Sequence, residues 1–193
     1  FTLADGRVDV PIHFDMHGSV FVVFQKPAKE SRTAAPAPAA ETVLTQITGP
    51  WKVEFPGGKE TFKELVSWHT HSDPAIKYFS GEAVYRTTFD LSGAGEGALL
   101  DLGEVHALAV VAVNGREVAT LWKSPYRVDI GPALRPGKNE LAVTVVNTWN
   151  NRLVGDAQRG AKNPTTFITT KSVKFNTPLQ PSGLLGPVRL VRE

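Results

Sequence analysis

Short segments in which apolar and polar residues alternate fill the chain from about residue 47 to its end, and tight-turn sequences separate them. Residues 83–91 and 139–147 put every second side chain on one apolar face, the period of a β-strand. Asn114-Gly115 and Pro136-Gly137 are turn sequences, because Gly and Asn accept positive φ angles and Pro fixes its own. No helical period continues for ten residues. Further strands are predicted at 51–55, 61–65, 107–113, 117–122 and 188–191. The pattern predicts an all-β fold, an antiparallel β-sandwich.

The first 26 residues predict a separate β-hairpin. Its first strand, residues 7–14, alternates, and its second, residues 19–24, is almost entirely apolar. An isolated hairpin is only marginally stable in water. We therefore expect this piece to be the remnant of a preceding domain, or a strand that adds to a sheet elsewhere.

Residues 27–46 form a Pro/Ala-rich stretch centred on Ala35-Pro-Ala-Pro-Ala-Ala40. Such a composition has too little apolar bulk for a core and favours an extended linker. The predicted organisation is therefore a hairpin at 1–26, a linker at 27–46 and a jelly-roll sandwich at 47–193.

Composition excludes several classes of function. The 193 residues contain no cysteine, so disulfides and Cys-based metal sites or nucleophiles are excluded. The formal net charge is only +2, and no run of five like charges exists, which argues against nucleic acid as a partner. No apolar stretch reaches the roughly 20 residues that a membrane span needs, so no membrane partner is expected.

Two sets of residues have the spacing of metal ligands. His13, Asp15 and His17 alternate along a predicted strand, and His69 and His71 repeat that spacing. Both sets are also compatible with ordinary exposed residues near turns. No metal site is predicted and the role of both sets stays open, although a structural calcium ion is compatible with the sequence.

Acidic residues are scattered, so no carboxylate pair for glycoside hydrolysis can be assigned. They include Glu82, Asp101, Glu104, Asp129, Glu140 and Asp156. No catalytic residue is predicted in this chain.

Candidate sugar-binding residues lie near two predicted strand ends. Trp122 and Trp149 could present flat faces on which sugars stack, whereas Trp51 opens a strand and is expected in the core. The polar residues that follow Trp149 are Asn150, Asn151, Arg152 and Asp156. They form either a ligand-facing cluster or a structural latch, in which Arg152 pairs with Asp156 across a loop.

Six motifs occur in order along the chain. They are Tyr78-Phe-Ser-Gly-Glu-Ala-Val-Tyr85, Leu100-Asp-Leu-Gly103, Val113-Asn-Gly115, Leu121-Trp-Lys-Ser-Pro-Tyr126, Asn147-Thr-Trp-Asn-Asn-Arg-Leu-Val-Gly-Asp156 and Pro181-Ser-Gly-Leu-Leu-Gly-Pro187. As a set they resemble the C-terminal galactose-binding-like jelly roll of glycoside hydrolase family 106 α-L-rhamnosidases and, more loosely, that of glycoside hydrolase family 2. Gly18-Ser-Val-Phe-Val-Val-Phe24 resembles the strand that precedes this domain in the same enzymes.

The resemblance implies an accessory role. In such enzymes the catalytic acids lie in an upstream barrel, which nothing here matches, so no catalytic residue is carried over. It implies a secreted or periplasmic bacterial protein whose partners are the upstream catalytic domain and a plant cell-wall or related glycan, rhamnose-containing ones first. A structural domain that binds no sugar is the alternative, and a small stand-alone hydrolase a third. Glu82 departs from the small residue or Thr that is usual at its position.

The linker can be tested by limited proteolysis. Because its composition supports no core, proteases should cut first within residues 27–46 and leave a folded fragment that starts near Thr48. The fragment's mass and N-terminal sequence measure this. First cuts elsewhere, or resistance of the whole chain, would contradict the boundary.

Overall fold

The computed structural model describes residues 1–12, 14, 18–27, 29–31, 41–93, 95–161, 164–169 and 172–192. The chain forms two compact units, one of residues 1–41 and one of Thr42–Arg192. In the first unit, β1 (Thr2–Ala4) pairs with β2 (Arg7–Asp9). No helix in the described part of the chain is long and apolar enough to cross a membrane.

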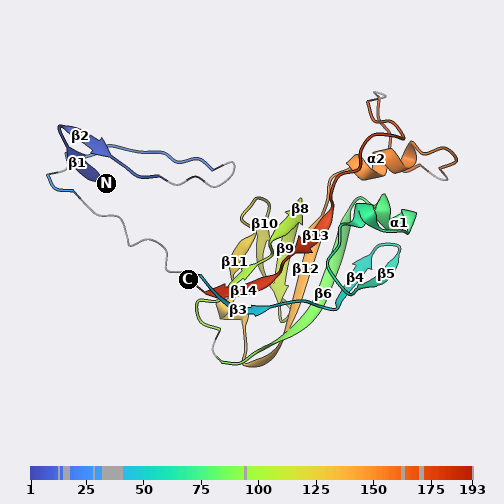
Figure 1. Cartoon of the computed structure of the whole chain (residues 1–193), viewed down its shortest axis with the longest axis horizontal. Helices are drawn as coiled ribbons and strands as arrows, with labels where there is room; N and C mark the ends of the chain where they lie inside the picture. The colour runs from blue at the N-terminus through green and yellow to red at the C-terminus, as the bar shows by residue number, and fades with distance from the viewer. Residues whose placement is uncertain are drawn as a thin grey trace. The chain divides into compact units, whose positions relative to one another are not determined.

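The second unit contains a six-stranded antiparallel sheet (Figure 1). Its spatial order is β10 (Arg116–Leu121), β9 (Leu108–Val113), β12 (Gly137–Val146), β6 (Glu82–Leu91), β4 (Trp51–Phe55) and β5 (Gly58–Phe62). The turn predicted at Asn114-Gly115 joins β9 to β10, which pair as a hairpin. Asn114 and Gly115 have the positive φ angles that such a turn needs, 51° and 80°.

A four-stranded sheet forms the opposite layer. Its order is β11 (Arg127–Asp129), β7 (Leu99–Asp101), β14 (Arg189–Arg192) and β3 (Thr42–Gln46). β8 (Glu104–His106) and β13 (Gly183–Gly186) form a separate short pair. The helical pieces are short: η1 (Trp68–Thr70), α1 (Pro74–Lys77), η2 (Gly131–Ala133) and α2 (Asn150–Asp156). The prediction of an all-β antiparallel sandwich is confirmed.

The predicted strand 61–65 is β5 at Gly58–Phe62, and the predicted strand 7–14 is a strand only at Arg7–Asp9 among its described residues. Three further differences concern the linker, residues 19–24 and the segment after Trp149. Residues 42–46, at the end of the predicted linker, form β3, which pairs with β14. The fragment expected from proteolysis therefore starts near residue 41 instead of Thr48. Residues 19–24 have the composition of a strand but no strand partner within the described residues. Residues 150–156 form the helix α2 instead of a polar loop. In each case the tertiary partner, present or absent, overrides local preference.

An aromatic cluster forms part of the hydrophobic core. Trp68 stacks on Tyr85 with ring centroids 6.3 Å apart, and Trp51 and Phe62 meet Tyr85 edge to face. Gly183 passes directly over this cluster with a φ of +99°, and a Cβ there would lie 2.6 Å from both the Trp68 indole nitrogen and the Tyr85 hydroxyl. Only glycine fits that approach, which explains the Gly in Pro181-Ser-Gly.

Asp101 joins three strands of the smaller sheet. Arg127 of β11 and Arg189 of β14 each donate from Nη2 to its Oδ2 at 2.8 Å, and the Gly103 N–H donates to Oδ1. The Asp101 side chain is only 7% exposed. This burial alone raises the pKa of the carboxyl, but the three donors outweigh it and hold the pKa of Asp101 below its usual value. The two arginines, about a third exposed, share one buried carboxylate.

Asp101→Asn should lower the free energy of unfolding at pH 7 by about 3 kcal/mol, because it leaves two arginines without their anion. A carboxyl whose pKa is depressed by folding stabilises above its unfolded pKa, near 3.9, and loses that contribution as the pH falls through the folded pKa. The variant should therefore lose less stability than the wild type between pH 5 and acid, as urea unfolding measures. Equal acid slopes would show that Asp101 makes no such contribution.

Candidate functional site

Two predicted sugar-binding tryptophans follow strands that end on the same side of the six-stranded sheet. Leu121, the last residue of β10, pairs with Ala109 of β9, and Ala109 pairs with Val145 near the end of β12. Trp122 follows β10 and Trp149 follows β12. Because only β9 lies between these two strands, their ends are roughly 10 Å apart at a spacing of about 4.8 Å between neighbouring strands. We call this side of the sandwich the α2 end, since α2 starts directly after Trp149.

The four tryptophans divide into two groups by exposure. Trp51 and Trp68 are fully buried, whereas Trp122 is 70% exposed and Trp149 is 64% exposed. Burial of a Trp side chain is strongly favourable, so large exposed indoles are uncommon on a surface that contacts only water. The α2 end thus presents two flat aromatic faces that the core does not use.

The two asparagines after Trp149 are engaged inside the protein. Asn151 is 2% exposed; its amide donates to the Gln180 carbonyl and its Oδ1 accepts from the Gln180 N–H. Asn150 donates to the Pro178 carbonyl at 3.3 Å and to Oδ1 of Asn151. These bonds fasten α2 to the segment that leads into β13, and the asparagines act as structural anchors.

Arg152 and Asp156 form the predicted pair, on successive turns of α2. Arg152 Nη2 lies 2.7 Å from Asp156 Oδ1, and the Asp156 side chain is 9% exposed. Its Oδ2 accepts from the Thr165 N–H and from both the N–H and the hydroxyl of Thr166. Burial raises the pKa of Asp156, but the Thr166 and Thr165 bonds and Arg152 outweigh it and lower the pKa. The pair is a latch that holds the following segment against α2.

The segment after α2 carries aromatic residues that sequence reasoning missed. Phe167 is 87% exposed and Phe175 is 52% exposed. Gln158 donates to the Phe175 carbonyl at 2.8 Å, and the Arg159 guanidinium lies 5.8 Å from the Phe175 ring centroid. Residues 157–181 contain basic residues but no acidic one. This excess of positive charge, together with two aromatic residues in a Thr-rich stretch, is the sequence feature that could have pointed to this segment.

The histidine sets give no metal centre in the described part of the chain. His69 Nδ1 lies 2.6 Å from the Ser67 hydroxyl, and His71 Nδ1 accepts from the Asp73 N–H while its ring stacks on Phe62. Asp73 caps α1 by accepting from the Ala75 N–H. Among described residues, no three His, Asp or Glu side chains cluster as metal ligands. His13, Asp15 and His17 lie outside the described residues.

Four of the six scattered acids have separate partners. Glu104 lies 2.7 Å from His106 Nε2, Asp129 accepts from the Gly131 N–H, and Asp101 and Asp156 are bound to arginines as described above. Glu82 is exposed at the start of β6, opposite Val146 and so at the α2 end. Its departure from the usual residue places a carboxylate beside the tryptophans' end of the sheet.

A groove on another side of the sandwich offers no stacking face. It lies between the β3–β4 and β13–β14 connections, and Thr48, Lys63, Leu65 and Pro187 help to line it. Trp51 also borders it, but that ring is buried under Gly49. The α2 end is therefore the better candidate for a site that depends on exposed aromatic rings.

The latch can be tested by substitution. Asp156→Ala removes an ion pair and three hydrogen bonds, so the free energy of unfolding should fall by about 3 kcal/mol, or roughly 6–12 °C in Tm. Thr166→Val is the matched control, because it deletes only the hydroxyl and should cost about 1 kcal/mol. Thermal unfolding by circular dichroism measures both. An Asp156→Ala shift no larger than that of the control would contradict the latch.

The chain is 38% identical over 176 residues to a Formosa agariphila protein named "Putative beta-glucuronidase", with 75% of this chain and 15% of that protein covered. The structure of a rhamnosidase from Novosphingobium sp. PP1Y matches with a TM-score of 0.78 and 42% identity, over 87% of this chain and 16% of the enzyme. A Ruminococcus gnavus β-glucuronidase in complex with C6-substituted uronic isofagomine matches at TM-score 0.59 and 16% identity, over 82% of this chain and 30% of that one, which shows the shared fold alone.

The chain thus spans less than a sixth of the length of the two more similar proteins. Residues 59–177, well over half of the chain, match the family described as glycosyl hydrolase 2 galactose-binding domain-like. This range runs from β5 through α2 and includes both exposed tryptophans. The protein therefore belongs to the glycosyl hydrolase 2 galactose-binding domain-like family.

Proposed function

We propose that this chain is a non-catalytic carbohydrate-binding module within a longer glycoside hydrolase, and that its ligand site is the α2 end. The observation that carries the proposal is the exposure of Trp122 and Trp149 beside two strands that end together, while the other two tryptophans are buried. Sugar C–H groups stack on such aromatic faces. Phe167 and Phe175, on the segment held to α2 through the latch and Gln158, are further exposed aromatic residues.

The parent enzyme is proposed to be a family 106 α-L-rhamnosidase, secreted or periplasmic. Support comes from 42% identity to the Novosphingobium rhamnosidase, whereas the solved β-glucuronidase is only 16% identical. Rhamnose-containing plant cell-wall glycans are accordingly the first ligands to test. The Formosa relative's printed name makes glucuronic acid-containing glycans the second.

A structural domain without a ligand is the second candidate, and a specific observation favours it. Asn151 is buried and Asp156 is half-buried, both are hydrogen-bonded, and Asn150 and Arg152 are bonded to neighbours. These four residues therefore offer a sugar few free polar groups. Any binding at the α2 end would depend mainly on the tryptophans.

Affinity measurements separate the two candidates. A shallow site on one or two sugar rings should bind with a Kd of roughly millimolar to tens of micromolar, about −4 to −6 kcal/mol. Trp122→Ala and Trp149→Ala should each weaken binding about tenfold, since a stacked ring contributes on the order of 1 kcal/mol or more. Both rings are mostly exposed, so Tm should change little. Calorimetry and affinity electrophoresis with rhamnogalacturonan give the readout.

Phe21→Ala is the matched control, because Phe21 is an exposed aromatic residue of the other unit. Its affinity should equal that of the wild type. Absence of binding to every glycan on a broad array would leave the structural candidate. Release of reducing sugar that persists through purification would overturn both candidates.

A further inference from the structure

The unit of residues 1–41 exposes a run of five consecutive apolar residues, 20–24. Phe21 is 94% exposed, Phe24 75% and Val23 68%, and Val20 and Val22 are exposed as well. The only strand pairing described in this unit joins three residues of β1 to three of β2. Contiguous apolar surface of this kind marks an interaction site on a soluble protein.

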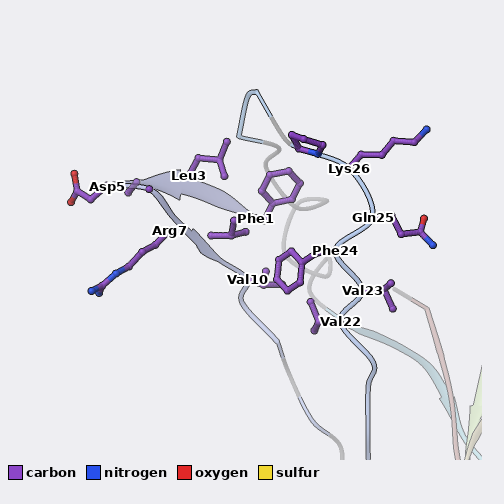
Figure 2. Close-up of a pocket in the computed structure, with 14 residues that line it drawn as sticks. Phe1, Leu3, Asp5, Arg7, Val10, Val22, Val23, Phe24, Gln25 and Lys26 are labelled. Atoms are coloured by element: carbon purple, nitrogen blue, oxygen red, sulfur yellow. The ribbon is translucent and has the colours of Figure 1, made fainter.

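The pattern of residues 19–24 specifies how that surface is covered. Along an extended segment, Val20, Val22 and Phe24 point one way, and Phe21 and Val23 point the other. Figure 2 shows Val22 and Phe24 turned toward Phe1 and Val10, with Val23 on the opposite side. A strand that lies on a sheet surface needs one apolar face. Two apolar faces are typical of an inner strand of a sheet that is covered on both sides.

A groove accompanies this segment. It has a volume of about 1160 Å³ and lies between the β1–β2 hairpin and residues 22–27, with Phe1, Leu3 and Val10 among its lining residues. Both of its walls carry apolar side chains (Figure 2). Segment and groove therefore adjoin, and both carry apolar side chains.

The comparisons indicate which kind of partner fits. The match to the Novosphingobium rhamnosidase covers 87% of this chain, more than residues Thr42–Arg192 contain, so it includes part of the first unit. That match accounts for only 16% of the enzyme. In a 42% identical protein, a counterpart of part of the first unit is thus joined to a much longer polypeptide.

We infer that residues 18–24 form an inner strand of a β-sheet in another domain of the same, longer polypeptide, and that side chains of that domain fill the groove. Main-chain pairing provides the affinity, and the alternating side chains Phe21, Val23 and Phe24 provide the fit, as in other strand additions. This inference rests on the longer polypeptide of the proposed function but not on sugar binding, so strand docking and glycan affinity succeed or fail separately.

Hydrogen exchange tests the inference by comparing the chain of 193 residues with the full product of its gene. Amides of residues 18–24 should exchange within seconds in the shorter chain and at least about 100-fold more slowly in the longer one. Equal, fast exchange in both would overturn the inference. So would protection in the shorter chain: if independent of concentration, it means docking on the sandwich, and if lost on dilution, pairing of two copies. A gene that encodes no further domain would also overturn it.

Variants distinguish docking from general folding. Phe21→Asp should leave the Tm of the shorter chain unchanged, because that side chain is almost fully exposed there, but should abolish protection of residues 18–24 in the longer protein. Phe21→Leu, the matched control, keeps an apolar side chain and should retain the protection. Protection that survives Phe21→Asp would show that the segment is not an inner strand. Glycan affinity, measured in parallel, should not respond to either substitution.

Discussion

The buried hydroxyl of Tyr85 is the interaction on which the rest of the sandwich depends. A buried hydroxyl destabilises a core unless it is hydrogen-bonded, and this one accepts from the Trp68 indole N–H and the Leu184 N–H. Tyr85 belongs to β6, Trp68 to η1 and Leu184 to β13. One oxygen thus ties the central sheet to two segments that are distant in sequence, and burial keeps its pKa above the usual value of a tyrosine.

That junction also positions the α2 end. The Ser67 hydroxyl, next to Trp68, donates to the Ser182 carbonyl and accepts from the Ser182 N–H, and Asn151 of α2 bonds the neighbouring Gln180 carbonyl. From the aromatic core outward, each hydrogen bond thus fixes the next segment. Trp149 is the N-cap residue directly before α2 and is therefore held by a helix whose inner side is anchored, while its indole stays exposed.

At the α2 end, burial separates the residues that stabilise the fold from those that are free to contact a ligand. Asn and Asp side chains that lose contact with water must find protein partners, so Asn151 and Asp156 serve the fold. Trp122 and Trp149 are exposed, so the fold does not gain the free energy of burying their rings; a ligand that covered them would gain it on binding. The same reasoning applies to Phe21 and Phe24 in the first unit, whose missing cover is proposed to be protein instead of sugar.

The sequence by itself determined the sandwich, because period-2 strands and turn residues such as Asn114-Gly115 are local signals that need no knowledge of partners. It also placed Trp51 in the core and paired Arg152 with Asp156. Only the tertiary structure decided that residues 42–46 are a strand, that residues 150–156 are a helix and that Trp122 and Trp149 stay exposed. Strand pairing with β14, docking of α2 and side-chain burial all depend on residues far away in the chain, and a local pattern carries no record of such contacts.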